Sequence, residues 1–446
     1  MNMSRKKTVK IALLVFLASL LGGGMRLSAQ TGAGNAHTPY SIFGVGDVIP
    51  QGTAYHKSMG GVGIASRNRK VINPLNPAAV TARDSLAFMV DFSLMHADKF
   101  YGQRDLKSGA NLTNFNDIII SFPIYHHSAM MVGAAPYSGL GYNFASYETD
   151  PALVGEVGNV SKASSGTGGL YQIFGAAGVT LWRRLSLGAE YIFYFGRMQK
   201  TSTVTYSSAG YNGVSSGYDM VLRGHTARFG LQYEQPLGSV TLGVGATYTL
   251  GTRLKGSVTD YKISNGSLVS DTLRYSVNDF SKDKVSLAGE LGVGVSLRGG
   301  ERWRAEVDYT RSDWGRTGID QVAGFANKSL SSFTATAAQS VRAGFEFIPN
   351  INDVRYYMRR ISYKAGAYFN KEYFLLDGNQ IHSAGVTLGF TLPINNQNTR
   401  MNNGVSVAVD FGQRGSLKGN QVRERYIGLT VGMNAFDIWF QKNRYL

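Results

Sequence analysis

A possible catalytic nucleophile lies at Ser215. Gly213-Val214-Ser215-Ser216-Gly217 matches the Gly-x-Ser-x-Gly pattern, which presents the nucleophilic serine of many hydrolases. That chemistry needs a strand-to-helix turn and a histidine base beside the serine, whereas this stretch falls in a predicted loop between two strands. In a chain with 55 glycines, such a match is expected by chance. We therefore predict that the protein is not an enzyme and that it has no catalytic residues.

The sequence indicates neither a metal site nor a cofactor site. His126 and His127 are adjacent, and neighbouring residues of a strand point to opposite faces, so a polar turn is the simpler interpretation. The seven histidines have no metal-site spacing, and the absence of cysteine excludes disulfides and thiolate ligands. The pairs Gly243-Val244-Gly245 and Gly292-Val293-Gly294 lack the further glycine and the helix of a phosphate loop. We expect no cofactor and no metal.

Six carboxylates on predicted strands could act in pairs as general acid and base. They are Asp91, Glu190, Glu290, Glu306, Asp308 and Asp410. Such chemistry depends on the separation of the two carboxyl groups, which the sequence does not give. A water-filled lumen, or hydrogen bonding to a plug within it, explains these residues without catalysis.

The elements that carry these residues are strands with one apolar face. In residues 239–251 every even position is apolar, from Val240 to Leu250, and every odd position is Ser, Thr or Gly. The same two-residue alternation recurs in 285–297 and 427–434. A soluble sandwich would bury the apolar face against a second sheet, whereas a membrane barrel turns it towards lipid.

The N-terminus favours the membrane barrel. Arg5, Lys6, Lys7 and Lys10 precede the apolar run Ile11–Leu21, and Leu27-Ser28-Ala29 offers small residues for cleavage. This pattern predicts a secretory signal peptide over residues 1–29, because the apolar run is too short to span a bilayer. No later stretch is long enough for a transmembrane helix, so a membrane protein of this sequence must be a barrel.

The positive charge does not indicate nucleic-acid binding. The formal net charge is +16, and the loss of the five cations of the signal peptide leaves +11. The remaining cations are scattered over predicted turns and loops and form no stripe. Attraction to anionic lipid headgroups explains them better.

Aromatic residues at predicted strand ends, among them Trp182, Trp303 and Trp314, are typical of interfacial girdles, although some could line an apolar pocket.

Period-two alternation predicts about fourteen strands in an all-β, antiparallel transmembrane barrel over residues 85–435. The strands fall near 86–101, 113–124, 128–141, 168–182, 185–206, 217–235, 239–258, 283–297, 302–314, 337–348, 361–375, 380–393, 403–413 and 423–435. Tight turns alternate with long loops near 102–112, 142–167, 207–216, 259–282 and 315–336. This alternation is typical of bacterial outer-membrane barrels. Residues 436–446 would form a periplasmic tail.

Residues 30–84 precede the first strand and have no usable periodicity. A disordered exported terminus is the simplest interpretation of such a stretch. It contains many apolar residues, among them Tyr40, Ile42, Phe43 and Val62, which would be poorly accommodated in a solvated tail. We therefore predict a compact N-terminal hatch that plugs the lumen of the barrel.

Several motifs resemble those of the FadL/TodX family of outer-membrane transporters for hydrophobic compounds. Ser58-Met59-Gly60-Gly61-Val62-Gly63-Ile64-Ala65, followed by Asn76-Pro77-Ala78-Ala79, resembles the glycine-rich hatch and its Asn-Pro-Ala signature. Pro136-Tyr137-Ser138-Gly139-Leu140-Gly141-Tyr142 resembles the stretch at which family members kink the third strand. Thr38–Asp47 and Trp439–Lys442 resemble the variety found in Bacteroidota. The chain departs from the family's enterobacterial barrels in ending on Tyr445-Leu446 after a basic tail.

The resemblance implies a function and two groups of site residues. A hatch would block the lumen, and a small hydrophobic molecule, such as a long-chain fatty acid or a similar lipid, would leave sideways through the kinked strand. Gly60, Gly61 and Gly63 would be hatch glycines, and Asn76, Pro77 and Ala78 the junction of hatch and barrel. Pro136, Tyr137, Gly139 and Gly141 would form the lateral opening.

The expected partners are a hydrophobic small molecule and outer-membrane lipids including lipopolysaccharide. We expect a monomer in the outer membrane of a Gram-negative cell, with no nucleic-acid partner. A second interpretation is a barrel that carries protein cargo for a type IX-like secretion machinery, because relatives in the Bacteroidota include one. What the purified barrel carries, a lipid or a protein, would discriminate between the two.

Overall fold

The computed structural model describes residues 37–438 apart from the stretches 84–86, 104–105, 126, 149, 183, 209, 267–269, 280–284, 327–331, 395–402 and 419–420. The predicted signal peptide and His126 lie outside the described residues. Within the described part of the chain, no helix has both the length and the apolarity needed to cross a membrane.

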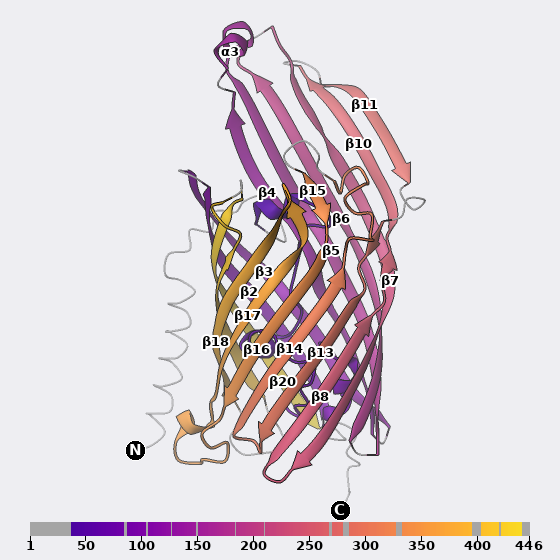
Figure 1. The fold of residues 1–446 in the computed structure, drawn as a ribbon, viewed down its shortest axis with the longest axis vertical. Coiled ribbons are helices and arrows are strands. Elements are labelled where there is room, and N and C mark those ends of the chain that lie inside the picture. The colour runs from indigo at the N-terminus through magenta and orange to yellow at the C-terminus, as the bar shows by residue number, and fades with distance from the viewer. Residues whose placement is uncertain are drawn as a thin grey trace, which may run out of the picture. The chain divides into compact units, whose positions relative to one another are not determined.

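Fourteen antiparallel strands form a closed barrel (Figure 1). Each strand pairs with the next, and β20 closes the ring by pairing with β2 from Ala87↔Ile438 to Gly102↔Arg423. In order, the strands are β2 (Ala87–Gln103), β3 (Leu106–Tyr125), β4 (Ser128–Tyr147), β5 (Val160–Leu181), β6 (Leu185–Tyr206), β7 (Gly213–Leu237), β8 (Val240–Thr249), β13 (Glu290–Gly299), β14 (Trp303–Asp313), β16 (Ala337–Phe347), β17 (Ser362–Leu376), β18 (Asn379–Pro393), β19 (Gly404–Arg414) and β20 (Arg423–Ile438). The predicted fold class and number of strands are confirmed.

The two-residue alternation corresponds to an apolar outer face and a small, polar inner face. On β13, Leu291, Val293 and Val295 are 44–49% exposed on the outside. The intervening Gly292 and Gly294 lie on the inside, against Ile64 of the N-terminal segment. An apolar exterior of this kind is stable in hydrocarbon and unfavourable in water.

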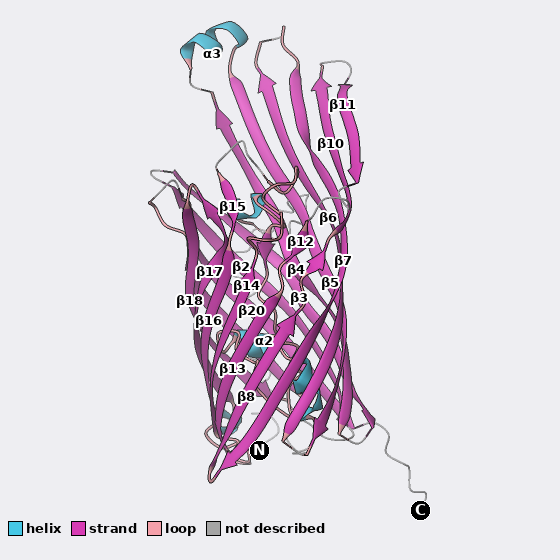
Figure 2. Cartoon of the chain, turned by 45° about the vertical axis from the view of Figure 1, so that its right-hand side comes forward, coloured by secondary structure: helices cyan, strands magenta, loops and turns pink. Residues whose placement is uncertain are grey.

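Several strands continue far above the others, which is a correction to the predicted loops. About 9–11 residues cross a bilayer, whereas β5, β6 and β7 have 22, 22 and 25 residues. The predicted loops near 142–167 and 259–282 contain the first part of β5 and the hairpin of β10 (Lys255–Asn265) and β11 (Ser270–Asp279). This extension also carries helix α3 (Pro151–Val157) and stands above the rest of the barrel (Figures 1 and 2).

The remaining elements are short. Helix α2 (Ala54–Lys57) and the 3-10 helices η1 (Pro39–Ile42) and η2 (Pro77–Ala82) belong to the N-terminal segment. η4 (Tyr357–Arg360) lies between β16 and β17. Three two- or three-residue strands complete the described set outside the N-terminal segment: β9 (Thr252–Arg253) pairs with β12 (Ser286–Leu287), and β15 (Phe333–Ala335) adds to β17.

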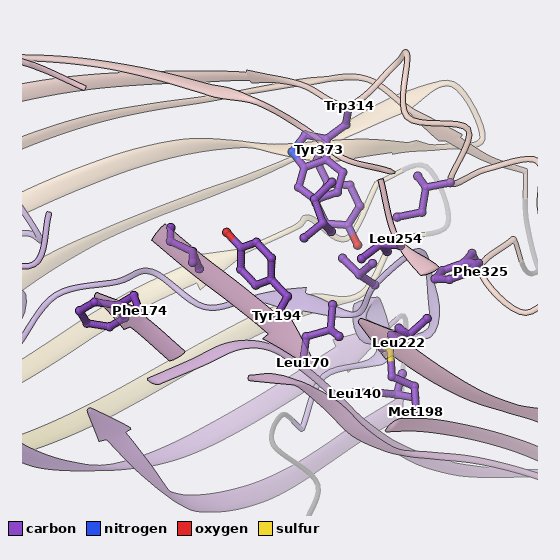
Figure 3. Close-up of a cluster of buried hydrophobic side chains, with 14 of the residues drawn as sticks. Leu140, Leu170, Phe174, Tyr194, Met198, Leu222, Leu254, Trp314, Phe325 and Tyr373 are labelled. Atoms are coloured by element: carbon purple, nitrogen blue, oxygen red, sulfur yellow. The ribbon is translucent and has the colours of Figure 1, made fainter. Parts of the chain in front are cut away.

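A cluster of buried apolar side chains lies among the strands of the barrel (Figure 3). Leu140, Met198 and Phe325 have no exposed area, although they come from segments far apart in the sequence. The ring of Trp314 packs against that of Tyr373 with centroids 4.7 Å apart. Trp314 is therefore part of this cluster and not of an interfacial girdle, whereas Trp182 is 83% exposed at a turn.

Candidate functional site

The wall of the barrel is incomplete between β3 and β4. The two strands pair from Tyr125↔Ser128 only as far as Ile118↔Ala134, although both continue well beyond that pair. β3 stays paired with β2 as far as Leu106, and β4 stays paired with β5 as far as Tyr147. The facing edges of the two strands therefore lack hydrogen bonds to each other, and we call this interval the β3–β4 gap.

β4 changes its course at the start of the gap. Pro136 pairs with Tyr171 whereas Ser138 pairs with Leu170, so Tyr137 is an extra residue in a β-bulge. Pro136 cannot donate a ladder hydrogen bond, and its place at a bulge is one that a sheet tolerates. From Ser138 to Tyr142 every residue is buried, which means that both faces of the strand are covered by protein.

Residues 47–52 of the N-terminal segment occupy the part of the gap next to the last β3–β4 pair, and we call them the closing segment. On the β4 side, β1 (Asp47–Val48) pairs with Ser138 and Gly139, and Ile49 N donates to Tyr137 O (2.9 Å). On the β3 side, Asn116 Nδ2 donates to Gly52 O (3.2 Å). A cavity of only about 10 Å³ remains among these residues.

Polar side chains fix the closing segment to β17 and β19 on one side and to β4 and β5 on the other. Asp47 Oδ1 forms an ion pair with Arg414 of β19 (2.6 Å), and Arg414 also contacts Glu372 of β17 (3.3 Å). Gln51 Nε2 donates to Pro136 O (3.1 Å), and its Oε1 accepts from Gln172 (2.7 Å). Arg414 is 5% exposed, so its charge is compensated mainly by these two carboxylates.

The predicted junction residues lie at another part of the wall. Asn76 is fully buried and precedes η2, where its Oδ1 accepts from Ala78 N (3.0 Å) and caps the helix. Its Nδ2 donates to Ile64 O (2.7 Å) and to Leu231 O of β7 (3.2 Å). Asn76 therefore joins two parts of the N-terminal segment to the barrel, and Pro77 starts η2 without an N–H to satisfy.

The predicted hatch glycines meet the opposite wall. Gly60 and Gly61 have φ values of +73° and +81°, which favour glycine, and Gly60 N donates to Thr387 Oγ1 (2.8 Å). Gly63 N and Ile64 N both donate to Asp308 Oδ2, at 2.7 and 3.0 Å. Asp308 is thus one predicted carboxylate that binds the N-terminal segment.

A buried histidine lies in the same part of the N-terminal segment. Burial, followed by the charges of Lys364 and Arg304, lowers the pKa of His56 to about 3. The ring is therefore neutral at physiological pH, and its Nδ1 lies 3.0 Å from Thr53 Oγ1.

We expect Gly188→Ala to loosen η2. A Cβ at Gly188 would overlap the backbone of Pro77 and Ala78, so either the helix or β6 must shift. Overpacking of this kind costs about 1–3 kcal/mol. Faster hydrogen exchange in residues 76–82 of the purified protein would show the effect. Gly175→Ala is the matched control, because a Cβ there meets nothing within 4 Å, and equal exchange in the two variants would contradict the prediction.

Behind the closing segment lies a cavity of about 400 Å³ in the lumen. Asp47–Gln51 form part of its wall, and the cavity is rich in charged side chains, which are Lys57, Lys99, Arg228, Glu290, Asp308, Arg342, Lys371, Glu372, Asp410, Arg414 and Glu424. Three predicted carboxylates therefore line this cavity, and Glu190 instead pairs with Arg228 (3.3 Å). Among the described residues, no three His, Asp or Glu side chains are placed to hold a metal.

The structure places the predicted site residues in three separate regions. Pro136, Tyr137, Gly139 and Gly141 all lie at the gap, and the carbonyl of Gly141 accepts from Thr38 N (2.9 Å). The junction residues and the hatch glycines contact other strands. Ser215 lies within β7 and not in the predicted loop, and its Oγ is 3.0 Å from Thr203 Oγ1, with no helix following.

Sequence reasoning missed the residues that close the gap: Asp47, Gln51, Asn116 and Arg414. Each forms contacts with residues far away in the chain. Asp47 and Arg414, for example, are 367 positions apart. A single carboxylate or amide forms no sequence motif, so its distant partner cannot be predicted from the sequence. The proline at 136 was the available signal, and it identified the β4 side of the gap.

Several solved structures that resemble this chain are outer-membrane transporters of FadL/TodX type. The toluene transporter TbuX of Ralstonia pickettii has a TM-score of 0.57 at 15% identity, covering 86% of this chain and 98% of that one. The Pseudomonas putida toluene transporter TodX gives 0.55 at 14%, with coverage of 88% and 100%. A Pseudomonas aeruginosa FadL homologue gives 0.53 at 11%, with coverage of 88% and 100%. At these identities the likeness shows the fold.

The chain was also compared with curated proteins and with family models. No curated protein matches it. The family model described as BamG matches residues 6–446, which is nearly the whole sequence. The chain therefore belongs to the BamG family, and it has the barrel fold of the FadL/TodX transporters.

Proposed function

We propose that the protein is an outer-membrane channel for small hydrophobic compounds, and that the β3–β4 gap is its lateral exit. A substrate captured among the outer loops reaches the apolar cluster, the closing segment moves, and the substrate passes between β3 and β4 into the membrane. In this role the N-terminal segment, residues 37–83, acts as the hatch.

The proposal rests on one observation. The barrel wall has a gap, and the segment that lies in it contacts the wall only through noncovalent interactions. The closing segment has two paired residues on β4 and a hydrogen bond to β3, which is far less than a full strand would have. An opening there leads from the interior to lipid. Each methylene buried on that path gains roughly 0.8 kcal/mol, which a path through water would not supply.

The charged lumen supports a lateral route over an axial one. Lys57, Arg342 and Asp410 line the cavity behind the closing segment, and such a wall solvates hydrocarbon poorly. The names of the similar structures agree with a hydrophobic substrate, because TbuX and TodX are toluene transporters. Long-chain fatty acids and monoaromatic hydrocarbons are therefore the compounds to test.

A disulfide across the closing segment tests the proposal. Val48 and Ser138 are direct partners of an antiparallel pair, whose Cα separation is within disulfide range, and the chain has no cysteine. We expect oxidised Val48→Cys/Ser138→Cys protein to lose uptake of labelled oleate and toluene into cells, down to the level of cells without the protein. Reduction should restore uptake, since the bond alone holds the segment.

The matched control places the same bond away from the gap. Thr259→Cys/Val277→Cys links partners of the β10–β11 hairpin and should leave uptake unchanged in both redox states. Undiminished uptake by the oxidised Val48→Cys/Ser138→Cys variant would overturn lateral exit. A protein that co-purifies with the wild-type barrel, together with no saturable uptake of either compound, would favour the cargo-carrying function instead.

A further inference from the structure

The connection between β16 and β17, residues 348–361, has a defined structure of its own, and we call it the rim loop. Asp353 Oδ1 accepts from Arg355 N (2.9 Å) and Tyr356 N (2.7 Å), and its Oδ2 pairs with Arg359 (3.3 Å). Asn350 N donates to Arg359 O (2.8 Å), which closes the loop ahead of β17. The loop is therefore an ordered surface on a rim where most connections are short turns.

The rim loop turns towards the outside of the barrel. Tyr363 OH donates to Met358 O (3.1 Å), and Tyr363 pairs with Phe347, which is 44% exposed on the apolar outer face. On the other side, Tyr357 OH donates to Pro393 O at the end of β18 (3.0 Å). The loop thus continues the apolar exterior at the foot of β16 and β17 (Figure 1).

Its surface combines exposed apolar side chains with arginines. Val354 is 91% exposed and Met358 64%, and both would be unfavourable in water. The guanidinium carbons of Arg355 and Arg359 lie 5.3 and 4.9 Å from the ring centre of Tyr356, and that of Arg360 lies 4.9 Å from the ring centre of Tyr357. These stacked pairs keep the charges beside the apolar groups.

We propose that the rim loop binds the phosphate headgroups of the inner leaflet, with Val354 and Met358 entering the acyl region. Tyrosine prefers this depth, and long arginine side chains reach from it to phosphate. Three arginines against one aspartate give the loop a positive charge. Contact with the outward-facing Tyr363 favours lipid over a soluble partner, because the loop continues the surface that lipid covers. The proposal depends on the membrane location and not on transport.

Fluorescence from a single labelled cysteine tests the insertion. The full chain carrying Met358→Cys, labelled with bimane, is reconstituted into vesicles of phosphatidylethanolamine and phosphatidylglycerol. We expect a blue-shifted emission that is quenched by lipids with a shallow doxyl group and protected from iodide. Tyr275→Cys on β11 is the control and should behave as a water-exposed site. Emission from position 358 equal to that control would overturn the proposal.

Lipid retention tests the arginines. In the reconstituted protein, Arg355→Gln/Arg359→Gln should reduce retention of phosphatidylglycerol in native mass spectra by about fivefold per arginine. Arg197→Gln/Arg274→Gln removes two exposed arginines of the extension and should change nothing. Retention unchanged in both variants, or a protein partner lost from cell extracts only with the rim-loop variant, would assign this surface to something other than lipid.

Discussion

Asn76→Asp is expected to undock the middle of the N-terminal segment. The amide nitrogen of Asn76 donates to the carbonyl oxygens of Ile64 and Leu231, and a carboxylate would place an acceptor there instead. The residue is fully buried, and an uncompensated buried charge costs about 3–5 kcal/mol. Hydrogen exchange of the detergent-solubilised protein at neutral pH should become fast across residues 60–80.

Asn76→Ala separates the charge from the lost hydrogen bonds. This variant loses the cap of η2, worth about 1 kcal/mol, and leaves carbonyl groups without a donor, but it adds no charge. Its exchange should therefore lie between those of the wild type and Asn76→Asp. Lowering the pH to protonate the introduced carboxylate should slow exchange, relative to the intrinsic chemical rate at each pH, in the Asn76→Asp variant alone. If the hydrogen-exchange rate of Asn76→Asp equals that of the wild type, Asn76 does not hold the segment.

Arg414→Met is expected to free the closing segment from β17 and β19. It removes the cation that lies between Asp47 and Glu372 and leaves two carboxylates of a buried site without their partner. Breaking a fully buried pair costs about 3–5 kcal/mol, and the partial exposure of both carboxylates makes the cost smaller here. A cysteine introduced as Ser138→Cys, which is fully buried beneath β1, should then react much faster with a maleimide.

Two variants separate the charge from the packing of Arg414. Arg414→Met combined with Asp47→Asn and Glu372→Gln removes the stranded charges and should recover slow labelling of Ser138→Cys. Arg425→Met, an exposed arginine of β20, should leave labelling unchanged. Equal labelling in Arg414→Met and the wild type would exclude Arg414 as an anchor of the closing segment.

Most of the barrel could be predicted because lipid and lumen demand different side chains on the two faces of each strand. The prediction for β6, residues 185–206, has the bounds seen in the structure, and Leu291, Val293 and Val295 point outwards as the alternation requires. A strand whose two faces meet the same surroundings has no apolar–polar alternation, so this pattern does not predict it. Residues 160–167 and most of the β10–β11 hairpin stand in the extension, so the sequence predicts loops there.

Less of the candidate site could be predicted from the sequence. Pro136 predicts a bulge because proline has no backbone N–H to donate to the sheet. The identity of this single residue is enough for the prediction. Asn116 and Arg414 owe their roles to partners in the N-terminal segment, and nothing adjacent to them differs from any other inward-facing polar residue. A resemblance identified the glycines and the Asn-Pro-Ala residues, whereas the contacts that hold them are made with residues far away in the sequence.

The contacts of Thr38 and Tyr40 have a consequence for folding. Thr38 Oγ1 donates to Glu424 (2.7 Å) across 386 residues of sequence, and Tyr40 OH donates to Val422 O (2.5 Å) across 382. Contacts so distant in sequence form late, because the entropy of closing such a loop must be overcome first. The side chains of Thr38 and Tyr40 therefore lack these two partners until the final strand has formed. Ring closure and docking of the N-terminus are expected to be a single late event.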